Sequence, residues 1–279
     1  MLASMDERGL DGLTPELLRQ TRADWWDDAM TRVLVERIPE ESRWLADVGC
    51  GFCKGATEVL PARASLRWIG IDADRARLPE ARRAVDAAGL AARVETLYGR
   101  AEALPLGTGT CDVVLFNTTL MHLAEPERAL AQARRVLRSG GRVLAVEPVH
   151  TSQHAYYDGA QDAVDDAMRT LLWRARDARR PRDTNIGARL PALVRGGGFE
   201  PIDVRVHTVQ QVRWEGARQW AERRTTDAQN VARFAGLDPE GEEIAAYRRA
   251  ARDLVEAGDP ERSGCGIATA TVVVVVGRR

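Results

Sequence analysis

The sequence Leu45-Ala46-Asp47-Val48-Gly49-Cys50-Gly51 decides how the rest of the chain is interpreted. Its mainly apolar first half predicts a buried strand, and its two glycines predict a tight turn into a helix. A strand, turn and helix in this order bring backbone N–H groups towards a polar or anionic ligand, with glycine wherever a Cβ would collide. Two glycines are also all that an ordinary turn needs, so the stretch requires support from elsewhere.

Apolar runs alternate with helical stretches downstream of this turn, which predicts βαβ units and a parallel sheet. One helix is predicted from Pro79 to Asp86, ending near Gly89, and another begins at Glu125-Pro126-Glu127 and ends at Ser139-Gly140-Gly141. The five strands predicted here are residues 44–48, 67–71, 94–98, 111–116 and 142–147.

The last third predicts a terminal pair of strands, residues 202–206 and 268–276, separated by a long helical insertion. Helices are expected at 158–178, 214–234 and 242–255. We expect residues 1–34 to form an N-terminal helical cap segment and residues 35–279 to form one α/β domain, with helical insertions at about 150–185 and 211–263. The insertions either cover a substrate or pack against the flank of the domain.

Composition excludes several kinds of protein. The 40 basic and 41 acidic residues leave a net charge of -1, so no polyanionic partner is indicated. The N-terminus resembles no signal peptide, and the longest apolar run is too short for a membrane span, so we expect a cytoplasmic protein. Lys54 is the one lysine among many arginines, which we interpret as the coding bias of a GC-rich bacterial genome.

Two features test whether the turn binds a nucleotide. Asp72 ends the second predicted strand, 21 residues after Gly51, where a carboxylate can accept hydrogen bonds from both ribose hydroxyls. Alternatively, Asp72 or Asp74 caps the next helix. A nicotinamide dinucleotide site would need glycine where Lys54 stands, so that alternative is disfavoured. Cys50 and Cys53 form a C-x-x-C that serves either metal or redox chemistry or the packing of the turn; a zinc site would need a second pair.

The stretch from Leu45 to Gly51 resembles the first motif of class I S-adenosylmethionine-dependent methyltransferases, in the methyltransferase type 11-like group. This chain departs from the motif at Cys53, where a third glycine is common, and at Arg100, where the family has aspartate. Further family-like segments follow in order: 99–106, 111–117, 120–123, 137–144 and 190–199.

The resemblance implies an α/β, Rossmann-like fold with a seven-stranded, mostly parallel sheet, an antiparallel C-terminal strand, helices on both faces and helical cap insertions. It also implies S-adenosyl-L-methionine as the cofactor and no metal. To the implied contacts we add Trp26, which either covers the cofactor or pins its helix to the core. The predicted cofactor-binding residues are Asp47, Gly49, Cys50, Gly51, Asp72, Ala101, Glu102, Asn117, His122 and Trp26.

Three histidines follow the fourth and fifth predicted strands, where the active site of an open α/β sheet belongs. Histidine titrates in the range useful for a general base. We rank His150 first as the catalytic candidate and His154 second; His122 is the third, and in the family it commonly packs beside the cofactor. Glu147 is either a base or a buried, satisfied acid.

We expect transfer of a methyl group to oxygen, nitrogen or carbon of a small molecule, for instance in bacterial secondary metabolism. The predicted partners are a small-molecule substrate and a second copy of the chain in a possible homodimer. We expect no nucleic-acid partner and no membrane. The alternatives are an RNA or protein methyltransferase, a nicotinamide-dependent oxidoreductase, and a non-catalytic binding protein on the same fold. An arginine cluster at residues 174–182 is either an anion site or a solvated helix face.

Overall fold

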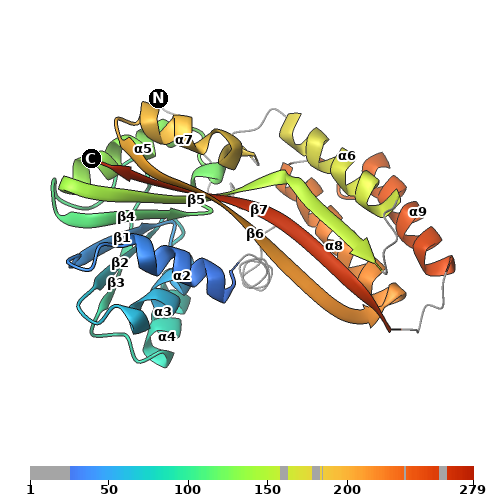
Figure 1. Cartoon of the computed structure of the whole chain (residues 1–279), viewed down its shortest axis with the longest axis horizontal. Coiled ribbons are helices and arrows are strands. Elements are labelled where there is room, and N and C mark those ends of the chain that lie inside the picture. Colours follow the sequence, from blue (N-terminus) through green and yellow to red (C-terminus); the bar gives the residue numbers. More distant parts are fainter. Residues whose placement is uncertain (1–25, 158–162, 178–182, 184, 236, 258–262) are drawn as a thin grey trace. The chain divides into compact units, whose positions relative to one another are not determined.

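The computed structural model describes residues 26–157, 163–177, 183, 185–235, 237–257 and 263–279 (Figure 1). The chain divides into two compact units. We call Asp28–His150, Pro181–Thr208 and Thr271–Arg279 the sheet unit, and Met1–Asp27, Thr151–Arg180 and Val209–Ala270 the helical unit. Three long strands contribute residues to both: β5 (Leu137–Tyr157), β6 (Glu200–Gly216) and β7 (Ser263–Arg278).

The sheet has seven strands in the order β3-β2-β1-β4-β5-β7-β6. The remaining strands are β1 (Trp44–Val48), β2 (Arg67–Asp72), β3 (Val94–Tyr98) and β4 (Cys111–Asn117). The five from β3 to β5 pair in parallel, with Val48 opposite both Ile71 and Phe116. β7 runs against its neighbours β5 and β6 (Figure 1). The predicted mixed Rossmann-like sheet with an antiparallel C-terminal strand is therefore confirmed.

Helices cover both faces of this sheet (Figure 1). On one face α2 (Asp28–Arg37), α3 (Lys54–Val59) and α4 (Leu78–Ala87) contact one another; α5 (Pro126–Val136) and α7 (Ile186–Gly196) meet on the other. Proline lies in the first turn of α4 and α5, where its missing N–H costs nothing. Two short 3-10 helices, η1 (Leu60–Ala62) and η2 (Leu120–His122), complete the unit.

The last strands are longer than the sequence analysis predicted. Residues 139–141 do not end α5, which stops at Val136; they belong to β5, where Gly140 has a φ of +74°. Trp214 lies in β6 and not in the predicted helix, because α8 begins only at Ala217. Apolar residues alternate with polar ones from 202 to 206 and again at 212 and 214, the period of a strand, which a helical interpretation of Trp214 overlooked.

The helical unit contains α6 (Ala163–Asp177), α8 (Ala217–Ala235) and α9 (Glu242–Glu256), which pack on one another. Residues 158–162 and 178 of the predicted helix 158–178 lie outside the described residues. Met168, Leu171, Ala228 and Tyr247 are among the buried residues of the unit's own core. No helix in the described part of the chain is long and apolar enough to cross a membrane.

Candidate cofactor site

The glycine turn lies at the carboxyl ends of β1 and β4, where the strand order reverses and open α/β sheets bind their ligands. Gly49 and Gly51 have φ of +75° and +54°, which side chains with a Cβ rarely adopt. A Cβ on Gly49 would lie 2.5 Å from Oγ1 of Thr119. That hydroxyl donates to the carbonyl of Val48 at 2.9 Å, so the loop after β4 packs against the turn and is hydrogen-bonded to it.

Asp72, at the end of β2, is joined directly to the turn. Its Oδ2 accepts the N–H of Gly51 at 2.8 Å, and its Oδ1 accepts the N–H of Asp74 at 2.9 Å. A carboxylate has about four acceptor positions, so one bond on each oxygen leaves capacity for two hydroxyl donors. The N-cap residue of α4 is Arg77, so Asp72 does not cap this helix, while Asp74 accepts the N–H of Ala76 at 2.9 Å just before it. The arrangement fits an acid that faces a ribose.

Asp47 is buried and ties β1 to β2. Its Oδ2 accepts the indole N–H of Trp68 at 3.3 Å, and Gly55 lies against both groups. The position agrees with an acid that steadies the turn from within, because the side chain is 3% exposed and thus largely withdrawn from solvent.

The C-x-x-C packs inside the sheet unit. Cys50 and Cys53 are free and buried, with both Sγ atoms close to Gly70 of β2. A hydrogen bond with Cys53, together with burial, raises the pKa of the Cys50 thiol well above its ordinary value, so the thiol stays protonated. Within the described residues no group of His, Cys, Asp and Glu side chains could hold a metal ion. The N–H of Cys50 donates to the carbonyl of Ile71 at 3.1 Å, and its own carbonyl accepts the N–H of Cys53 at 2.9 Å, so its contact with a cofactor stays a prediction.

The loop after β3 is held beside Asp72, because the N–H of Gly99 donates to the Asp72 carbonyl at 3.1 Å. Ala101 is buried in this loop, and Glu102 pairs with Arg100 at 3.6 Å. Arg100, which stands where the family has aspartate, therefore pairs with the nearby carboxylate of Glu102. These contacts bring Ala101 and Glu102, two of the predicted cofactor-binding residues, to the same edge of the sheet as Asp72.

The loop after β4 contains residues that the sequence analysis missed. Thr118 has a φ of +51°, an unusual value for a β-branched residue, and it separates Asn117 from Thr119. The N–H of His122 donates to the Thr119 carbonyl at 3.0 Å, so His122 closes a short 3-10 turn. A strained loop at a site is common where geometry matters for function, but no sequence pattern announces it.

Glu147 on β5 organises this loop. Its Oε1 accepts the N–H groups of Thr119 at 2.8 Å and Leu120 at 2.6 Å, and the residue is 0% exposed. Burial raises the pKa of the carboxyl to about 8, even though the N–H groups of the loop lower it. Glu147 is thus a buried acid whose Oε1 is paired with the loop, while its Oε2 has no hydrogen-bond partner among the described residues, so neither of its two predicted roles is decided.

The remaining predicted residues divide between the units. His150 ends the β5 segment of the sheet unit, three residues after Glu147. His154 belongs to the helical unit, where its Nδ1 lies 3.3 Å from Oδ2 of the buried Asp165. Trp26 also belongs to the helical unit, so its contact with a cofactor, like the catalytic roles of the histidines, stays a prediction.

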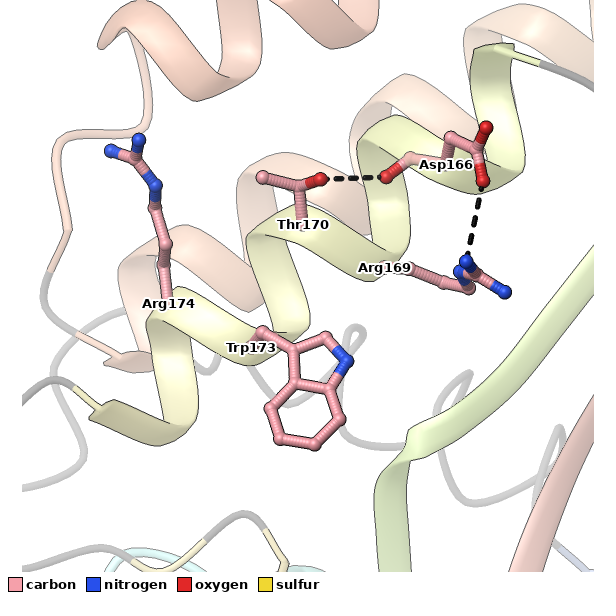
Figure 2. Close-up of a pocket in the computed structure, with 5 residues that line it drawn as sticks. All are labelled: Asp166, Arg169, Thr170, Trp173 and Arg174. Carbon is pink, nitrogen blue, oxygen red and sulfur yellow. Dashed lines mark hydrogen bonds and ion pairs between the residues drawn. The ribbon is translucent and has the colours of Figure 1, made fainter.

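A surface hollow of about 510 Å³ lies along α6 in the helical unit. Figure 2 shows Trp173 and Arg174 pointing to different sides of the helix, and Arg169 turned towards Asp166. Arg174 pairs with Glu243 of α9. None of the lining residues belongs to the predicted cofactor set, so the hollow does not define the cofactor site. Its lining residues are Asp166, Arg169, Thr170, Trp173 and Arg174.

Comparison with solved structures defines the class of fold. Geranyl diphosphate methyltransferase in complex with SAM superposes with a TM-score of 0.53 at 14% identity, covering 96% of this chain and 92% of that one. The [4+2]-cyclase SpnF superposes with a TM-score of 0.51 at 22% identity, covering 88% and 80%. At such identities the likeness shows the fold alone: the chain has the class I methyltransferase fold.

The sequence comparisons add a family match over part of the chain. Residues 46–145 match the family model described as "Methyltransferase domain". The ubiquinone/menaquinone biosynthesis C-methyltransferase UbiE of Roseobacter denitrificans is 30% identical over 135 residues, which are 47% of this chain and 53% of that protein. The chain thus matches about half the length of this relative.

Proposed function

We propose that this protein transfers a methyl group from S-adenosylmethionine to an oxygen, nitrogen or carbon atom of a small molecule. The observation that carries the proposal is the junction of the glycine turn with Asp72, whose carboxylate accepts the Gly51 N–H at 2.8 Å. This junction lies within the stretch that matches the methyltransferase family.

The residues present fit the cofactor. The turn has no side chain at Gly49 and Gly51. Thr119 already fills the space that a Cβ would take at Gly49. Asp72 retains acceptor capacity for the ribose hydroxyls, and the loop at Ala101 and Glu102 lies beside it for adenine. When bound, S-adenosylmethionine supplies a methyl group that its sulfonium makes electrophilic.

The work left to the protein is positioning. The Gly49–Gly51 turn and Asp72 hold the nucleoside, while the loop from Asn117 to His122, fixed by Glu147, forms the wall next to it. A rigid wall favours catalysis because a reacting pair held at about 3 Å no longer has to lose translational freedom in the reaction step. Acceptors that carry a proton also need a base, and His150 is the first-ranked of the two candidates in the sheet unit, the other being His122.

The net charge of -1 favours a small-molecule substrate over a nucleic acid, since a surface that binds a phosphate backbone needs an excess of positive charge. The similarity to the [4+2]-cyclase SpnF illustrates why fold alone does not decide the chemistry. Formation of methylated product is therefore the decisive observation.

The test follows S-adenosylhomocysteine released from S-adenosylmethionine in the presence of a hydroquinone, a catechol, a primary amine or bulk RNA. We expect turnover with at least one of the small molecules and none with RNA, and we expect Asp72→Ala to lower the specificity constant. Methylation of RNA alone would replace the small-molecule assignment. Binding of the cofactor with no turnover on any acceptor would favour the non-catalytic alternative.

A further inference from the structure

The edge strand β6 carries a stripe of apolar side chains in the sheet unit. Ile202, Val204 and Val206 are 40%, 46% and 69% exposed, and because they alternate along a strand they lie on one face. β6 is the last strand in the order of the described sheet. Edge strands usually avoid such a surface, since unpaired backbone groups beside apolar side chains form a template for another strand.

We propose that the stripe is the dimer interface of this protein, with β6 of a second copy pairing antiparallel to it across a two-fold axis at Val204. In this register Val204 lies opposite the partner's Val204, and Ile202 lies opposite the partner's Val206. The pairing joins the two sheets edge to edge and covers all three apolar residues with their own counterparts. Cross-strand pairs of β-branched residues of this kind stabilise antiparallel sheets.

Charge favours this occupant and this register. Asp203 and Arg205 lie on the opposite face of the strand, and the same axis places Arg205 opposite the partner's Asp203. Within one chain, Nε of Arg205 is 3.0 Å from Asp203, with the arginine side chain 63% exposed and thus accessible to a partner strand. Asp203 is anchored by Arg37 of α2 at 2.9 Å.

Neighbouring registers are penalised. Moving the axis to Asp203 would place two aspartates opposite each other, and moving it to Arg205 would place two arginines opposite each other, both of which destabilise a strand pair. Moving a single strand by one residue would set apolar side chains against the charged face. The segment Ile202-Asp203-Val204-Arg205-Val206 is thus complementary to itself about its centre, which is the property a symmetric dimer requires.

The first test is the oligomeric state of the whole chain, measured by light scattering after size exclusion at loading concentrations up to about 100 µM, since a short strand pair suggests micromolar affinity. We expect a dimer for the wild type and a monomer for Val204→Glu, which places two carboxylates at the axis. Val212→Glu is the matched control, because Val212 is an exposed apolar residue of β6 outside the pairing, 56% exposed. It should remain dimeric.

The second test addresses the register. Val204→Cys should form an intersubunit disulfide when oxidised glutathione accepts the two electrons and two protons, since opposite Cα atoms in an antiparallel pair are about 4.5 to 5.5 Å apart. Val206→Cys should not link to itself, although mixed with Ile202→Cys it should. The wild type controls for the native thiols.

A wild type that is monomeric at every concentration would overturn the proposal, as would a dimer that survives Val204→Glu with unchanged circular dichroism. Efficient self-linking of Val206→Cys would overturn the register. Because the cofactor plays no part in these measurements, their failure is distinguishable from failure of the proposed methyl transfer.

Discussion

At the scale of single residues, Asp72 does two things at once: it fixes the turn through Gly51 and presents a carboxylate at the end of β2. We predict that Asp72→Ala raises the Kd for S-adenosylmethionine by roughly 10- to 100-fold, because hydrogen bonds to a charged group contribute about 1.5 to 3 kcal/mol each. Isothermal calorimetry measures the change. Asp74→Ala, which leaves the Asp72 side chain in place, is the control, and equal affinities for both variants would refute the ribose role.

Gly49 tests the contact between the turn and the loop after β4. We predict that Gly49→Ala lowers the free energy of unfolding by more than Gly89→Ala does. Both glycines have positive φ, +75° and +70°, but only at Gly49 would the Cβ meet Thr119. The strain common to both is about 1 to 2 kcal/mol. Urea denaturation gives the comparison, and equal losses for the two variants would show that Thr119 does not constrain the turn.

Glu147 makes stability depend on pH. Its carboxyl has a pKa of about 8 in the folded chain against 4.5 as the ordinary value, so between these values the folded state holds the proton that the unfolded state has lost. Stability from this group is therefore complete below about pH 4.5 and falls as pH rises to about 8. Glu147→Gln cannot ionise. We therefore predict that its free energy of unfolding, relative to that of the wild type, rises between about pH 4.5 and 8 and stays constant above pH 8. If the urea midpoints of the wild type and of Glu147→Gln differ by the same amount at every pH from 5 to 9, the shifted pKa is contradicted.

At the scale of elements, the sequence predicts regular pieces better than their ends. The strands and helices predicted from Trp44 to Val136 match the structure closely, since β1, β2 and β4 are buried and α4 and α5 have proline in the first turn. β5 and β6 extend well beyond their predicted ends. β6 lies next to β7 in the sheet, and such pairing between distant segments is not contained in local periodicity.

The site shows the same division. Asp47, Gly49 and Asp72 stand out in the sequence because their spacing matches the pattern of a nucleotide-binding turn. The strained Thr118 and the support that Glu147 gives to Thr119 depend on which loop meets which strand, so only the fold reveals them. The buried packing of Cys50 against Gly70 likewise needs β1 and β2 to be placed side by side.

His150, in the β5 segment of the sheet unit, is the subject of the prediction for catalysis. We expect His150→Ala to lower kcat by about 100-fold or more while cofactor binding is retained, because a general base contributes on that order. His207→Ala is the matched control, because His207 lies in β6 and is not a catalytic candidate. Turnover with an acceptor found active in the wild type measures both, and full activity of His150→Ala would return this histidine to a structural role.

At the scale of the whole molecule, two compact units share three long strands, and the residues proposed to hold the cofactor, with the exception of Trp26, lie in the sheet unit. The match to the methyltransferase family covers residues 46–145, all within that unit. The helical unit has a core of its own built from α6, α8 and α9.

Calorimetric titration of the whole chain with S-adenosylmethionine, S-adenosylhomocysteine and NAD tests the central claim most directly. The account predicts stoichiometric binding of both sulfur nucleosides, in the range of about 1 to 100 µM, and no binding of NAD, because Lys54 stands where the dinucleotide turn needs glycine. Binding of NAD with no response to either sulfur nucleoside would contradict it.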